Sequence, residues 1–153
     1  MAITLNDLLE PRRIRLDLAA ATKEEALREL IALLDKTEGV SQPTRFAEQV
    51  FTREKAGSTL AEHGIAFPHA RTDLASEIAL AIGRSSGGVP WNDAGERAHL
   101  IFVIAVPEKL AQDYLVVVGA LARITKDAAR RTALLAAKSA AEFIELLRSA
   151  PRL

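Results

Sequence analysis

Residues 53–71 read REKAGSTLAEHGIAFPHAR and are the most informative stretch of the sequence. A helical pattern ends near Lys55, before Gly57, and a polar loop follows it. The chain then continues as a short apolar segment into Pro68 and His69. Proline fixes its own φ and biases the preceding residue toward extended geometry, so we expect His69 on a stiff, defined piece of backbone. Such rigidity suits an imidazole that must present one ring nitrogen to a partner.

Groups that can bind an oxyanion surround His69 in this stretch. They are two guanidinium groups, two hydroxyls and two glycines that would let backbone amides approach a ligand closely: Arg53, Arg71, Ser58, Thr59, Gly57 and Gly64. Arginine pairs bidentately with phosphate oxygens, and clustered amides suit anions. A nucleophilic imidazole among such donors is what a phosphorylated histidine requires. Simpler alternatives stay open at this point, with His69 as a surface or capping residue and Arg53 as a solvated charge at a helix end. Ser58 and Thr59 would then form only a turn or cap.

The composition excludes several classes of function. The length of 153 residues suits one globular domain. The 20 basic and 20 acidic side chains balance, which argues against a nucleic-acid partner. Because the chain has no cysteine, disulfides, Cys-ligated zinc and a thiol nucleophile are excluded. The longest apolar runs, residues 100–106 and 115–122, are too short for a bilayer, and no signal-peptide core is present, so we expect a cytoplasmic protein without membrane insertion.

Helical and strand patterns alternate along the chain and predict an α/β fold with helices packed around a sheet. Strands are expected at residues 14–18, 65–67, 78–82 and 100–106, with an ordered loop at 56–64 and breaks at Gly83, Gly87, Gly88 and Pro90. Helices are expected at residues 5–9, 43–55, 111–125, 128–137 and 140–148, and the last of these follows a Ser139–Glu142 capping box. A further helix is expected to begin at a Thr22–Glu25 capping box and to continue to Leu34, with Gly39 just beyond its end. The uninterrupted run 100–106 predicts a strand covered on both faces, and segment 111–125, apolar nearly all round, predicts a buried helix.

The stretch 53–71 resembles the phosphotransferase-system (PTS) enzyme IIA domains of the fructose, mannitol and nitrogen-regulatory type, known as EIIA type-2. Their signature is R-E-x-x-G-S-T followed by G-I-A-x-P-H. The sequence matches it from Arg53 to Thr59 and from Gly64 to His69. The order of elements is also similar over a core of about residues 4–148. The resemblance implies a single domain over residues 1–153, with a mixed β-sheet flanked by α-helices.

The resemblance also implies that His69 is a phosphoryl acceptor. In the family, the histidine at this position takes a phosphoryl group from HPr or from its nitrogen-branch counterpart. Transport members pass the group to a IIB domain, and regulatory members bind other proteins in a phosphorylation-dependent way. The positions of Arg53, Ser58 and Thr59 lie near that histidine in the family. The chemistry is phosphoryl transfer by positioning and charge stabilisation without a cofactor, and histidine suits it because its unperturbed pKa is about 6.5.

Two positions depart from the family pattern. The loop between S-T and G-I-A is usually rich in glycine, whereas residues 60–63 here read LAEH. Glu62 would repel a phosphate, so we expect its side chain to point to solvent. Many members have a second histidine near the start of the helix at 111–125, and an ungapped alignment places Tyr114 there. Tyrosine can donate a hydrogen bond but cannot carry positive charge.

The other two histidines have weaker claims to a role. His63 lies six residues before His69 and could supply the missing imidazole, although a solvent-exposed loop residue is the favoured interpretation. His99 precedes an apolar run and is expected at a strand edge. The spacing of His63 and His69 is not the i, i+4 spacing of H-E-x-x-H, so we expect no metal site. No Walker pattern is present, so direct use of ATP is not indicated.

Two functions of different classes follow from these observations. The first is a phosphohistidine carrier of the PTS, a transferase component rather than a stand-alone enzyme, which would meet an HPr-type carrier and a separate IIB protein. The second is a non-catalytic regulatory binding module with altered or lost phosphotransfer, which would meet a target protein. The LAEH loop and Tyr114 favour the second function, and the intact motif at His69 favours the first. The sequence identifies neither a sugar nor a target.

Overall fold

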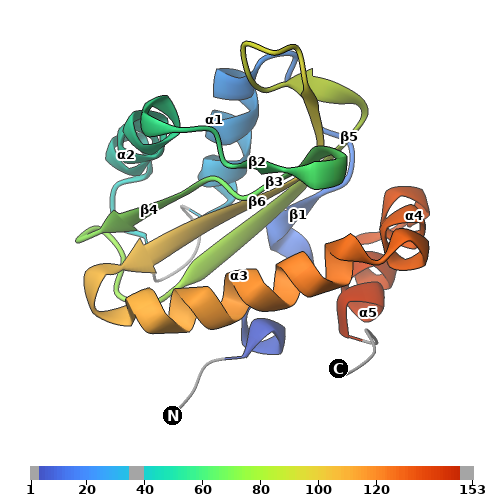
Figure 1. The fold of residues 1–153 in the computed structure, drawn as a ribbon. Helices are drawn as coiled ribbons and strands as arrows, with labels where there is room; N and C mark the ends of the chain where they lie inside the picture. Colours follow the sequence, from blue (N-terminus) through green and yellow to red (C-terminus); the bar gives the residue numbers. More distant parts are fainter. Residues whose placement is uncertain (1–3, 35–39, 149–153) are drawn as a thin grey trace.

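A mixed six-stranded sheet forms the centre of this computed structural model, which describes residues 4–34 and 40–148 (Figure 1). Its strands are β1 (Ile14–Arg15), β2 (Leu60–Ala61), β3 (Ile65–Ala66), β4 (His69–Thr72), β5 (Ala79–Pro90) and β6 (Arg97–Pro107). The strand order is β1-β5-β6-β3-β2, and β4 pairs with β6 beyond β3. The pairs β1/β5, β3/β6 and β4/β6 are parallel, whereas β5/β6 and β2/β3 are antiparallel. The sheet therefore confirms the mixed topology that the resemblance implied.

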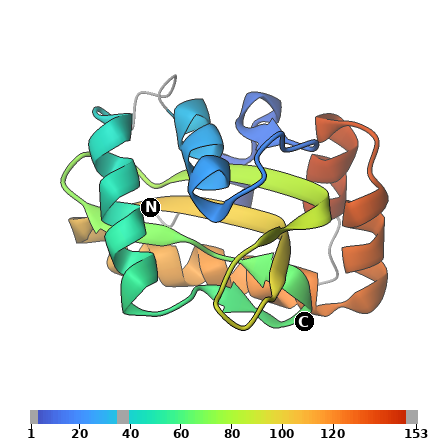
Figure 2. The same cartoon turned by 90° about the horizontal axis from the view of Figure 1, so that it is seen from above.

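Helices cover both faces of this sheet. The helices are α1 (Lys23–Leu34), α2 (Pro43–Ala56), α3 (Ala111–Lys126), α4 (Ala128–Ala136) and α5 (Ala140–Arg148). Short 3₁₀ segments also occur: η1 (Leu5–Leu8), η2 (Pro11–Arg13), η3 (Glu62–Gly64) and η4 (Glu108–Leu110). Figures 1 and 2 show α1 and α2 side by side on one face, with α3 running along the other face and α4 and α5 at its end. The arrangement confirms the predicted single α/β domain with a sheet flanked by helices.

The central strand β6 is buried on both faces, as its uninterrupted apolar run predicted. Side chains alternate across a strand, so Ile101 and Val103 pack toward α1 and α2 while Phe102 and Ile104 pack toward α3. All four side chains are fully buried. Truncating a fully buried phenylalanine to alanine typically costs about 3–5 kcal/mol, so Phe102 is a large contributor to stability. The rigidity of β6 matters for function because β4, which begins with His69, is hydrogen-bonded to it.

Both predicted capping boxes mark real helix starts. The Thr22 hydroxyl accepts from the Glu25 amide at 3.2 Å, and the Ser139 hydroxyl accepts from the Glu142 amide at 3.1 Å. The return bond of the first box goes one residue further back than in the usual pattern, from the Ala21 amide to the Glu25 carboxylate. The predicted stop at Gly39 lies outside the described residues.

Helix α3 corrects the prediction of a helix buried all round. Its buried residues are Val117, Leu121, Ile124 and Thr125. Leu115 and Val116 are instead 63% and 57% exposed. The reason is that α3 lies on one face of the sheet (Figure 1), and the contacts it makes with the sheet, η1 and α4 leave Leu115 and Val116 uncovered. Composition alone cannot reveal whether a second layer exists outside an apolar helix.

The strands also differ from the predicted ranges. Strand β1 ends at Arg15 rather than at Leu18, although the Leu18 amide still bonds to the Arg84 carbonyl. Strand β5 continues to Pro90 through the expected breaks. Gly83 pairs in register with Ile101, and an irregularity between Arg84 and Val89 contains Gly87 and Gly88. Strand β4 was missed, and the expected loop at 56–64 contains β2 and η3. Strand β4 pairs with β6, which is distant in sequence, and local patterns do not show such pairing. Strand β2 pairs with the nearby β3, but each of the two has only two residues, too few for a period-2 pattern.

Candidate functional site

His69 is the first residue of β4 and lies at the free edge of the sheet between α2 and α3. It pairs in register with Ile104 of β6. Its Nδ1 lies 2.9 Å from the Phe67 carbonyl oxygen, which can only accept a hydrogen bond. Nδ1 must therefore carry the proton, which leaves the lone pair on Nε2. The carbonyl of the preceding Pro68 accepts from the Ile104 amide at 3.0 Å, which ties the backbone before His69 to β6.

Tyr114 packs directly on the His69 ring. The two ring centroids are 4.9 Å apart with an interplanar angle of 30°, and the Tyr114 hydroxyl lies 3.4 Å from Nδ1. The structure thus places Tyr114 where the alignment expected a second histidine. Because Nδ1 already donates to the Phe67 carbonyl, the Tyr114 oxygen can receive only a weak share of that proton. The phenol holds the imidazole by stacking and adds no positive charge to the site.

The environment of His69 favours its neutral form. Burial is the largest influence and lowers the pKa of His69, while the hydrogen bond to the Phe67 carbonyl raises it. The nearby guanidinium of Arg53 lowers the pKa further, and the Glu54 carboxylate opposes that effect. The net result is a pKa below the ordinary value, so the imidazole is uncharged near neutral pH. A neutral imidazole with a free Nε2 is a competent nucleophile.

A cavity of about 520 Å³ opens beside His69, between β4 and α2. Three arginines line it, Arg45, Arg53 and Arg71, together with the carboxylate of Glu48. The Arg53 guanidinium also donates to the Gly57 carbonyl at 2.8 Å, which holds the side chain in place. The structure therefore brings Arg53 and Arg71 together with His69, as the sequence suggested. Such a basic cavity suits a phosphoryl group carried on the imidazole.

Arg45 is a member of this cavity that the sequence analysis missed. It lies eight residues before Arg53 on α2, and residues at i, i+4 and i+8 share one face of a helix. Counting back eight residues from Arg53 along the predicted helix could therefore have identified Arg45.

Glu54 is a second residue whose role the sequence analysis did not assign. Its buried carboxylate accepts from both the amide and the hydroxyl of Thr59, and it pairs with the Lys23 ammonium at 2.7 Å. Thr59 is therefore held by Glu54 rather than turned toward the imidazole. The Thr59 carbonyl in turn accepts from the Phe67 amide at 3.1 Å. Glu54 thus fixes the loop after α2 to the segment that precedes His69.

Three other predicted site residues lie away from the imidazole. The Ser58 hydroxyl accepts from the Leu60 amide, and Ser58 lines a different cavity beyond α2. Gly57 has an extended φ of 167°, and a Cβ there would meet nothing within 4 Å. Gly64 has a left-handed φ of 74°, and a Cβ there would lie 2.9 Å from the His99 ring. Gly64 therefore allows close packing against β6 rather than approach to a ligand.

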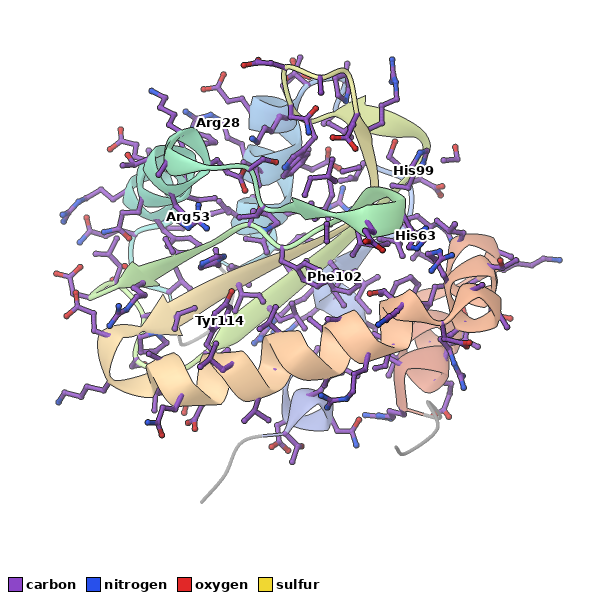
Figure 3. All side chains as sticks on the ribbon, in the orientation of Figure 1. Arg28, Arg53, His63, His99, Phe102 and Tyr114 are labelled. Atoms are coloured by element: carbon purple, nitrogen blue, oxygen red, sulfur yellow. The ribbon has the colours of Figure 1, made fainter. Side chains whose placement is uncertain are left out.

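His63 and His99 lie at the opposite end of β6 from Arg53 and Tyr114 (Figure 3). In the parallel register, β3 meets β6 at Leu100 while His69 meets it at Ile104, a separation of about 13 Å along the strand. His63 precedes β3, so the structure does not bring it to His69. Its half-exposed side chain faces the Glu62 carboxylate, which points to solvent as expected. The His99 ring bonds to the Ser85 carbonyl of β5 across the sheet.

The described part of the chain has neither a metal-binding cluster nor a membrane-spanning helix. Among residues 4–34 and 40–148, no group of three or more histidine and acidic side chains could hold a metal ion. Within the same ranges, no helix is long and apolar enough to cross a membrane.

The sequence and fold are similar to those of known proteins. The family model described as "Phosphoenolpyruvate-dependent sugar phosphotransferase system, EIIA 2" matches residues 7–150. The "PTS system fructose-specific EIIABC component" of Bacillus subtilis (strain 168) is 31% identical over 144 residues. That match covers 94% of this chain but only 23% of the longer relative.

Two solved structures share the fold over nearly the whole chain. "Nitrogen Regulatory Protein IIA-Ntr" from Neisseria meningitidis has a TM-score of 0.86 at 29% identity, covering 94% of this chain and 98% of that one. The complex of enzyme IIAMTL and phosphorylated enzyme IIBMTL from Escherichia coli gives a TM-score of 0.81 at 26% identity. That match covers 93% of this chain and 98% of the other chain.

Proposed function

Because this chain belongs to the family of EIIA 2 domains of the phosphoenolpyruvate-dependent sugar phosphotransferase system, we propose that it carries a phosphoryl group on His69. One observation supports this proposal above the others. His69 has its Nδ1 proton committed to the Phe67 carbonyl and its Nε2 unprotonated, at the edge of a cavity lined by three arginines. The donor in this proposal is an HPr-type phosphocarrier protein.

The transfer needs no external base. The Nε2 lone pair of His69 forms a bond to phosphorus while the nitrogen–phosphorus bond of the donor phosphohistidine breaks, and the electron pair of that bond stays on the donor imidazole. The proton on Nδ1 remains in place. The phosphorylated His69 ring then carries a positive charge, which the Phe67 carbonyl oxygen stabilises at 2.9 Å. The hydrogen bond that sets the tautomer of the unphosphorylated protein therefore also stabilises the phosphorylated form.

Charge around the cavity favours the phosphoryl group. Arg45, Arg53 and Arg71 oppose a single carboxylate, Glu48, so the lining has an excess of two positive charges. A phosphoryl group adds about two negative charges at neutral pH. Positioning and charge stabilisation of this kind account for most of the catalysis in phosphoryl transfer. Arg53 is the residue that we assign to direct contact with the phosphoryl oxygens.

Onward transfer in this proposal goes to a IIB protein on a separate chain. The support is the structural match to the Escherichia coli IIAMTL in its complex with phosphorylated IIBMTL. The reaction would take place in the cytoplasm, as expected from the sequence.

A regulatory binding function is the second candidate. It is favoured by the match to the nitrogen regulatory IIA-Ntr and by Leu115 and Val116, which are exposed on α3 directly after Tyr114. In that case phosphorylation of His69 would change the charge beside an apolar docking surface and so control the binding of a protein partner.

Incubation with enzyme I, HPr and phosphoenolpyruvate tests the carrier function. The carrier function predicts acid-labile phosphate on the wild-type protein and none on His69→Ala. His63→Ala is the matched control, because it removes an imidazole at the far end of β6 and is expected to label at the wild-type rate. Absence of label from every HPr-type donor tested would instead favour the binding module.

A further inference from the structure

A second cavity, of about 600 Å³, lies on the other side of α2 from His69. It is formed by the start of α1, the end of α2 and the loop that follows β5, and Figure 2 shows these three segments at one end of the molecule. Arg53 faces the His69 cavity, whereas its neighbour Glu54 lines this one. The phosphoryl-transfer chemistry leaves the second cavity without an assigned role. Its volume falls within the range of small-molecule sites.

The charges that line the cavity leave one cation and one anion without partners. Five charged residues line it. Lys23 and Glu54 pair with each other at 2.7 Å, and Glu24 pairs with the arginine one turn further along α1 at 3.5 Å. Within the described residues, Lys55 and Asp93 have no ion-pair partner. The cavity therefore presents one positive and one negative group to a ligand.

Trp91 supplies a further unpaired donor. Its side chain is only 3% exposed and forms part of the cavity wall. Its indole N–H is buried and has no hydrogen-bond acceptor among the described residues, which is uncommon for a tryptophan in this setting. The Lys23 ammonium lies 4.9 Å from the centre of the indole ring, and Phe51 provides an apolar wall. An acceptor group and an apolar group on one ligand would match these features.

We propose that this cavity binds the zwitterion of an apolar α-amino acid. Its carboxylate would be held by the Lys55 ammonium and the Trp91 indole N–H, its ammonium group by the Asp93 carboxylate, and its side chain by Phe51. A phosphate dianion would face the carboxylates of the lining, and a simple cation would face its lysines, so a zwitterion fits the paired charges better than either. The proposal does not depend on phosphorylation of His69.

Fluorescence of the wild-type protein tests the proposal directly, because Trp91 is the only tryptophan of the chain. L-phenylalanine is the probe, and excitation at the red edge of the indole band avoids the absorbance of the ligand. We expect a saturable change in Trp91 emission. Phenylpropanoate, which lacks the ammonium group, and phenylethylamine, which lacks the carboxylate, should each bind at least about tenfold more weakly.

Variants separate the two charged contacts. Asp93→Asn should weaken L-phenylalanine about tenfold and leave phenylpropanoate unchanged, whereas Lys55→Gln should weaken both. Lys126→Gln, at the end of α3, is the matched control and should bind like the wild type. Trp91→Phe removes the N–H donor and should weaken the binding of L-phenylalanine, which is measured by calorimetry because this variant has no indole fluorescence. The proposal is overturned if about 10 mM L-phenylalanine gives no saturable signal, if phenylpropanoate binds as tightly, or if Asp93→Asn binds like the control.

Discussion

Replacing Glu54 with alanine tests how the site loop is held. The change removes the acceptor of two hydrogen bonds from Thr59 and the partner of the Lys23 ammonium. Hydrogen bonds to a charged acceptor contribute about 1.5–3 kcal/mol each, so the two Thr59 bonds set an upper range of about 3–6 kcal/mol. Loss of the ion pair adds less than the two Thr59 bonds, because the Lys23 ammonium lines a cavity that water can enter and keeps its contact with the Trp91 ring. Because the freed loop can also bond to water, we expect a loss of about 3 kcal/mol.

Urea denaturation monitored by circular dichroism measures this free energy of unfolding. Glu48→Ala is the control, since Glu48 lies on the same helix but is exposed, and a change within about 0.5 kcal/mol is expected. Glu54→Gln keeps an acceptor oxygen for Thr59 and should lose about half as much as Glu54→Ala. Phosphate labelling of His69 should slow in Glu54→Ala, because the Thr59 segment also bonds to Phe67. A loss below about 1 kcal/mol, or one equal to that of Glu48→Ala, would refute the reasoning.

Three further changes have expected outcomes. Burial holds the pKa of His69 below its value in the unfolded chain, so the unfolded chain binds the proton first as pH falls below about 6.5 and the folded state loses stability there. His69→Gln should flatten this part of the curve of stability against pH, and an unchanged curve would contradict the lowered pKa. Arg84→Met removes the donor that bonds to the carbonyls of Leu16, Leu134 and Ala137, so chemical denaturation should show a loss of about 2–4 kcal/mol, and a neutral result would exclude the anchoring role. His63→Gly relieves a left-handed φ of 64° and should raise stability by about 0.5–1 kcal/mol, whereas a lowered melting temperature would count against strain at this position.

Local patterns were sufficient for the helices and for the central strand. The capping boxes at Thr22 and Ser139 depend on bonds three residues apart, which the sequence displays directly. The run at residues 100–106 is apolar at every position, and such a short run bounded by Pro107 is typical of a strand covered on both faces. The motif around Pro68 and His69 identified the imidazole because its spacing is long and fixed.

Long-range pairing decided what the sequence could not show. Strand β4 has only four residues, and its existence depends on hydrogen bonds to β6, more than thirty positions away. The partial exposure of α3 depends on the absence of an outer layer among the described residues. The loop after α2 is held by the buried carboxylate of Glu54, whose partner Lys23 comes from another helix. None of these features has a local pattern to predict it.

The sequence by itself determined the α/β class, the helix starts and the histidine at the centre of the candidate site. Only the tertiary structure decided the state and surroundings of that histidine. The Phe67 carbonyl selects the tautomer, burial lowers the pKa, and α2 brings Arg45 and Arg53 to the imidazole while η3 holds His63 away from it. The physical reason is that residue type and spacing act along the chain, whereas burial, proton position and the neighbouring charges are set by segments that meet in space.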